Sequence, residues 1–76
     1  MRYNSQRQEF FADNGRVLVT KEMYESGYYE YVVRVPNGQV EIKTSKREAI
    51  DTAKAIAYRS EFAFNPIFDY EEKRVD

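Results

Sequence analysis

The chain has 76 residues, with 12 Lys and Arg against 13 Asp and Glu, and it contains neither Cys nor His. This composition excludes a disulfide framework, a thiolate or imidazole metal site and catalysis by a histidine base. A net charge of −1 argues against a protein that depends on phosphate contacts, whereas the 16% aromatic residues can supply both core and contact surface.

We expect a single domain over residues 1–76, with frayed ends at 1–8 and 72–76. No apolar run has the length of a signal peptide or of a membrane span. Together with the lack of Cys, this predicts a cytoplasmic protein that makes no membrane contact.

The three glycines close three similar turns along the first half of the chain. Glu9-Phe10-Phe11 is a candidate short strand that leads into the first of these turns. The runs between the turns are rich in β-branched and aromatic residues, and this regular spacing is typical of an antiparallel meander. The turns are Asp13-Asn14-Gly15, Glu25-Ser26-Gly27 and Pro36-Asn37-Gly38.

The second turn predicts a three-residue hairpin loop with Gly27 in the left-handed conformation, which glycine adopts without a steric penalty. In the resulting register Met23 lies opposite Tyr29, and Val19 lies opposite Val33. The apolar side chains of the two strands then share one face of the sheet.

For the third turn, Pro36 suits the first corner of a four-residue loop over residues 36–39. In this register Val33 lies opposite Ile42, and Arg34 forms a cross-strand pair with Glu41. The two hairpins then agree, and they predict one inner face made of Val17, Val19, Lys21, Met23, Tyr29, Tyr31, Val33, Val35, Val40, Ile42 and Thr44.

A helix is predicted from residue 46 to about residue 60. Ser45 and Glu48 have the spacing of a capping box at its start. An apolar stripe at helical spacing predicts the side that packs on the inner face of the sheet. This stripe consists of Ala49, Ile50, Ala53, Ile56 and Ala57.

The C-terminal stretch EFAFNPIFDYEEKRVD predicts an edge strand that is interrupted at Pro66. After a helical crossover, such a strand runs parallel to the first or the third strand. The expected fold class is therefore α+β, with a three- to five-stranded antiparallel meander, one helix on one face and the order (β)βββαβ.

We find no motif for catalysis, and we expect a non-enzymatic protein without a cofactor or a bound metal. Glu22 opposite Glu30 is the one candidate metal pair, but no third ligand accompanies it. The acidic residues near the C-terminus, Asp69, Glu71 and Glu72, have the pattern of solvated surface.

Binding to another protein is the function class that remains best supported. The predicted contact residues are types enriched at interfaces and lie on the outer face of the sheet. A mildly basic helix face forms a second candidate surface. The outer-face residues are Leu18, Tyr24, Tyr28, Val32 and Arg34, and the helix residues are Lys46, Arg47 and Lys54.

Three alternatives stay open. The same tyrosines with flanking Arg and Lys are also the features of a nucleic-acid-binding sheet, although Glu22, Glu30 and Glu41 would repel a phosphate backbone. The protein can also be a subunit that associates with itself. Finally, the outer face can be covered by the C-terminal aromatic residues or by Tyr3, Phe10 and Phe11.

The stretch YYEYVVRVPNGQVEIKTSKREAIDTAKAIA, followed by an aromatic strand, resembles a layout found in small phage-encoded inhibitors. These include anti-CRISPR proteins and phage inhibitors of bacterial RNA polymerase. The resemblance covers residues 28–70 and consists of a hairpin, a capped Ala-rich helix and a last strand. It implies a protein in the host cytoplasm that blocks a host enzyme or defence complex by occupying its surface.

Overall fold

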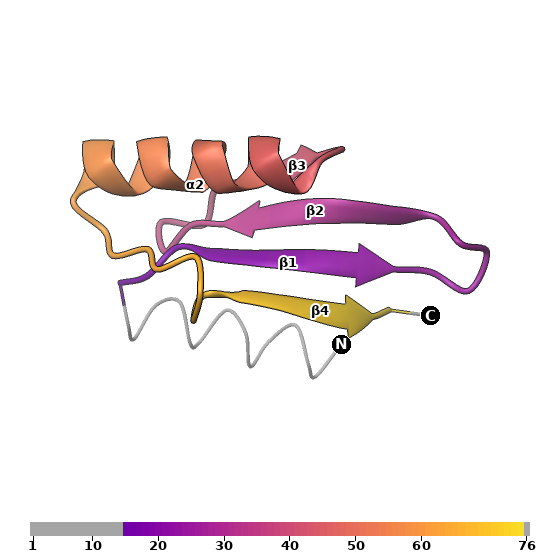
Figure 1. Ribbon diagram of the computed structural model, residues 1–76. Helices are drawn as coiled ribbons and strands as arrows, with labels where there is room; N and C mark the ends of the chain where they lie inside the picture. Colours follow the sequence, from indigo (N-terminus) through magenta and orange to yellow (C-terminus); the bar gives the residue numbers. More distant parts are fainter. Residues whose placement is uncertain (1–14, 76) are drawn as a thin grey trace.

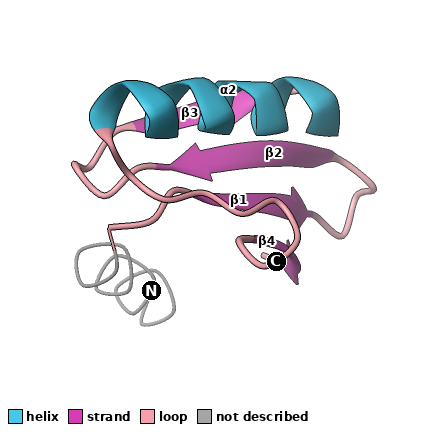
Figure 2. Ribbon diagram, turned by 60° about the vertical axis from the view of Figure 1, so that its left-hand side comes forward, coloured by secondary structure: helices cyan, strands magenta, loops and turns pink. Residues whose placement is uncertain are grey.

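The computed structural model describes residues 15–75, which form one mixed four-stranded sheet and one long helix (Figure 1). The strand order in the sheet is β3-β2-β1-β4, and the helix lies along one face (Figure 2). The elements along the chain are β1 (Leu18–Met23), β2 (Tyr29–Arg34), β3 (Val40–Lys43), α2 (Lys46–Ser60) and β4 (Tyr70–Arg74). This confirms the α+β class and the order βββαβ, while the first candidate strand, residues 9–11, lies outside the described residues.

The first hairpin has the register that the sequence predicts. Val19 pairs with Val33, and Met23 pairs with Tyr29. The loop contains three residues, and Gly27 closes it with a φ of 98°. Because this φ is strained for any residue with a Cβ atom, the position of the glycine fixes the loop length and hence the register.

The register predicted for the second hairpin is wrong by one residue. Val33 pairs with Glu41, and Arg34 pairs with Val40. The loop again has three residues, since the Val35 amide donates to the Gln39 carbonyl at 3.0 Å and Gly38 has a φ of 96°. The shift turns the whole of β3 over, because successive side chains of a strand point to opposite faces.

As a consequence, β3 contributes different residues to each face than we expected. Val40 and Ile42 lie on the outer face and are 54% and 59% exposed. Glu41 and Lys43 lie on the inner side and are half-buried there. The core below the helix therefore ends at β2 and does not reach the side chains of β3.

The helix begins where the sequence predicts. Ser45 is the N-cap, and its hydroxyl accepts a hydrogen bond from the Glu48 amide at 3.1 Å. Three alanines of the predicted stripe are buried, together with Ile56. Their small size lets the helix backbone approach the valines of the sheet closely. The core consists of Val17, Val19, Tyr31, Val33, Val35, Ala49, Ala53, Ile56 and Ala57.

The last strand starts later than the aromatic pattern suggests. Residues 61–69 form an irregular crossover, in which Phe62 and Phe64 pack against the core. The strand β4 then pairs in parallel with β1, so the sheet is mixed and is not a purely antiparallel meander. Residues 72–74, which we expected to be frayed, are part of this strand.

Candidate protein-binding surface

The predicted outer-face surface is only partly accessible. Leu18 and Val32 lie on the outer face, as expected, but they are 5% and 3% exposed. These two residues therefore cannot form a contact surface, and the prediction of their exposure is wrong. A chain of 76 residues needs this burial, because its single core on the helix side is small.

One alternative was that the C-terminal aromatic residues cover the outer face of the sheet. Phe62 and Phe64 pack on the opposite, inner side, and Phe68 is 77% exposed, so these aromatic residues do not form the cover. The other candidates, Tyr3, Phe10 and Phe11, lie outside the described residues.

Arg34 is held in place by an ion pair. Its guanidinium donates to the Glu22 carboxylate at 2.7 Å, and the two side chains are 19% and 9% exposed. The predicted pair with Glu41 does not form, because the register of β3 has placed Glu41 on the other face. Arg34 thus neutralises a buried carboxylate and is not a free contact residue.

The turn between β1 and β2 carries two tyrosines on the outer side. The rings of Tyr24 and Tyr28 lie 5.4 Å apart, and both hydroxyls donate to the carboxylate of Glu30, at 3.3 and 3.0 Å. Tyr28 is 58% exposed. The hydrogen bond to Glu30 and the negative charge of this carboxylate raise the pKa of Tyr28 above its ordinary value, because the bond stabilises the protonated phenol and the charge disfavours the phenolate.

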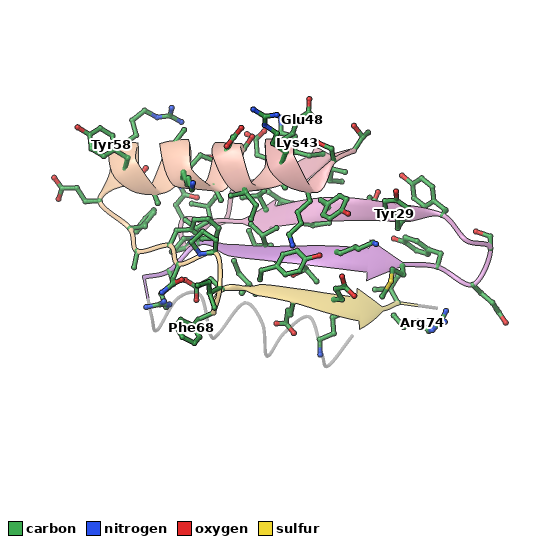
Figure 3. All side chains as sticks on the ribbon, viewed as in Figure 1. Tyr29, Lys43, Glu48, Tyr58, Phe68 and Arg74 are labelled. Carbon is green, nitrogen blue, oxygen red and sulfur yellow. The ribbon has the colours of Figure 1, made fainter. Side chains whose placement is uncertain are left out.

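A third tyrosine lies on the inner side of the same turn. Tyr29 is 48% exposed, although its parity with Tyr31 predicted a core position. The reason is the length of the hairpin, whose end extends beyond the first turn of α2 (Figures 1 and 3). Tyr31, two residues further along β2, is covered and is only 8% exposed.

Tyr29 is also fixed by its neighbours. Its ring meets the Tyr31 ring edge-on at 5.8 Å, and the Lys21 ammonium lies 4.4 Å from its centre. We call the group of Lys21, Tyr24, Tyr28, Tyr29 and Glu30 the tyrosine tip. It presents ring surface on both faces of the hairpin, and each ring has a partner that restrains its orientation.

The second predicted surface is less cationic than its sequence suggests. The Lys46 ammonium lies 4.4 Å from the centre of the Tyr70 ring. Arg47 and Lys54 are exposed. Asp51 lies between them on the same side of the helix, four residues after Arg47 and three residues before Lys54. One carboxylate therefore offsets part of the positive charge of this surface.

Sequence reasoning missed one further exposed apolar pair, Ile67 and Phe68. They are 80% and 77% exposed at the end of the molecule opposite to the tyrosine tip (Figure 3). Asp69 holds the loop in shape: its carboxylate accepts two bonds from Arg16, at 3.0 and 2.8 Å, and one from the Asn65 amide. The only local sign in the sequence is the turn-forming pair Asn65-Pro66.

The candidate metal pair is used in another way. Glu22 is bonded to Arg34, while Glu30 accepts hydrogen bonds from two tyrosines. Within residues 15–75, no three acidic side chains come together as a possible metal site. In the same part of the chain, no helix combines the length and the apolar character needed to cross a membrane.

Comparison with known proteins gives no relative from which a function can be transferred. No protein-family model, no curated protein and no solved structure matches this chain.

Proposed function

We propose that this protein is a non-enzymatic protein-binding module whose contact surface is the tyrosine tip. The observation that supports this most directly is the combination of exposure and restraint in Tyr28 and Tyr29, which are 58% and 48% exposed. Tyrosines are enriched at interfaces because they offer a large amphipathic area with few rotatable bonds. Rings that are already oriented lose little further freedom when a partner binds.

The proposed mode of action is occupation of a surface on a host protein or protein complex, as in the small phage-encoded inhibitors that the layout of the chain resembles. The length of the hairpin supports this mode, because its end projects past the helix and can reach a recessed site (Figure 1). The acidic side chain at its centre, Glu30, favours a partner with basic or hydrogen-bond-donating groups around an apolar pocket.

The experiment compares three immobilised proteins in a capture from bacterial lysate: the wild type, the double variant Tyr28→Ala/Tyr29→Ala, and Tyr58→Ala. Tyr58 is 90% exposed on α2 and serves as a matched control, since it is also a surface tyrosine. We expect the wild type and the control to retain the same partner, and the double variant to lose it. Equal retention by all three proteins would contradict the role of the tip.

The runner-up function is binding of single-stranded nucleic acid by the same tyrosines, which the cation of Lys21 beside Tyr29 favours. Binding of a labelled oligonucleotide, measured at increasing salt, separates the two functions. An affinity that falls steeply with salt supports the nucleic-acid function, because phosphate contacts release counterions. An apolar protein interface is much less sensitive to salt.

A further inference from the structure

The strand β3 is a sheet edge, with no further strand beyond it among residues 15–75. It is the outermost strand of the order β3-β2-β1-β4, and it contains neither proline nor glycine. Its outer-face side chains, Val40 and Ile42, are β-branched and more than half exposed. Edge strands of soluble monomers are usually protected by charges, prolines, bulges or a short length. In β3 the protection is limited to its length of four residues and to two inner-side charges of opposite sign, Glu41 and Lys43, while the outer side is apolar.

The backbone pattern shows which groups of β3 face outward. The hairpin bond between Val35 and Gln39, together with the pairing of Val33 with Glu41, directs the amide and carbonyl of Glu41 toward β2. In an antiparallel pair these directions alternate along the strand. The amides and carbonyls of Val40 and Ile42 therefore point away from the sheet, toward the position of a further strand.

The sequence Val40-Glu41-Ile42-Lys43-Thr44 is complementary to itself in one antiparallel register. With a two-fold axis at Ile42, Glu41 of each copy lies opposite Lys43 of the other, and Val40 lies opposite Thr44. Two neighbouring registers also align the outward backbone groups of the two copies. In one of them Glu41 lies opposite the second Glu41, and in the other Lys43 lies opposite the second Lys43. Charge pairing thus selects a single register among those that align the outward backbone groups.

We propose that two copies of the protein pair along β3 in this register and form one continuous eight-stranded sheet. The Ile42 side chains meet at the axis on the outer face, with Val40 beside them. Both helices then lie on the same, inner face, because a two-fold axis perpendicular to a sheet keeps its faces separate. The tyrosine tip lies at the turn between β1 and β2 and contains no residue of β3, so this pairing leaves it free for a partner.

The present surroundings of the two charged residues agree with this pairing. Glu41 and Lys43 form an ion pair within the strand at 3.7 Å, and their side chains are 36% and 31% exposed. Both can exchange this loose contact for a cross-strand contact without losing a buried bond. A four-residue edge is a small interface, so we expect dimers at about 100 μM protein and monomers at about 1 μM.

The test is sedimentation of the purified protein between about 1 μM and 1 mM, with charge-reversal variants. Each single variant, Glu41→Lys and Lys43→Glu, places like charges opposite each other at two symmetric positions, and should weaken association about tenfold or more. The double variant Glu41→Lys/Lys43→Glu restores opposite charges and should return the affinity to within about threefold of the wild type. It also shows that the reversed side chains are compatible with folding.

Arg74→Glu is the matched control, because this exposed arginine belongs to β4, the opposite edge strand of the sheet, and the affinity of this variant should equal that of the wild type. A wild-type protein that remains monomeric at the highest concentration would overturn the proposal. Dimers that are insensitive to both single reversals would overturn it equally, since they would form through another surface, such as the tyrosine tip or the exposed Ile67 and Phe68.

Discussion

Replacing Tyr31 and Tyr29 separately by alanine isolates the effect of the helix on the inner face. Both residues belong to β2, and their rings contact each other edge-on, so each variant removes one ring of the same pair. They differ in exposure, 8% against 48%. If a tyrosine ring has about 200 Å² of surface, Tyr31 buries about 185 Å² and Tyr29 about 105 Å², which at about 25 cal/mol per Å² corresponds to roughly 4.5 and 2.5 kcal/mol.

The assay is urea unfolding followed by circular dichroism. The difference of about 2 kcal/mol should appear as a difference of about 2 M between the two midpoints, because a domain of this size has an m-value near 1 kcal/mol per M. The free energy of unfolding of a 76-residue domain is about 4–11 kcal/mol, so Tyr31→Ala is expected to lie close to the limit of folding. Equal midpoints for the two variants would refute the distinction between a covered and an uncovered end of the hairpin.

Four further outcomes can be checked. Ser45→Ala removes the cap of α2 and should lower the free energy of unfolding by about 1 kcal/mol in urea titration. Gly38→Ala should cost about 1–2 kcal/mol, since φ is 96° while the Cβ position is open. Glu30→Gln should lower the pKa of Tyr28, measured by absorbance. Burial raises the pKa of Tyr70 to about 12. The stability that the protonated phenol contributes is complete below pH 10 and should be lost as the pH rises to 12. Tyr70→Phe should reduce this loss of stability.

The two hairpins show how far turn chemistry can be used to predict the fold. For the first, the spacing of Gly27 from the flanking strands allowed only one sensible loop length, and the predicted register is confirmed. For the second, Pro36 was compatible with a three-residue and with a four-residue loop. The Asn37 side chain, which accepts a hydrogen bond from the Gln39 amide at 2.9 Å, belongs to the shorter loop. The prediction chose the longer loop because Pro36 suits its first corner and because this register placed Val40 and Ile42 on the inner face with the other apolar residues.

The candidate surface was predicted in part. Tyr24 and Tyr28 lie together on the outer side of the hairpin, as the parity of the strands indicated. Strand parity, however, gives only the face of a side chain and not the length over which another element covers that face. Tyr29 is exposed because the helix begins too far back to reach it, whereas Leu18 and Val32 are buried on a face that we expected to be open.

The sequence by itself determined the order of the elements, the limits of the helix and the first hairpin, because these depend on interactions between residues that are close along the chain. A glycine at a left-handed position, a serine cap and an apolar period all act within one or two turns. The tertiary structure alone decided which side chains are exposed, including those of the edge strand, and how Asp69 and Arg16 hold the loop of Ile67 and Phe68. Exposure depends on all segments that pack against a residue, and most of these are distant in the sequence.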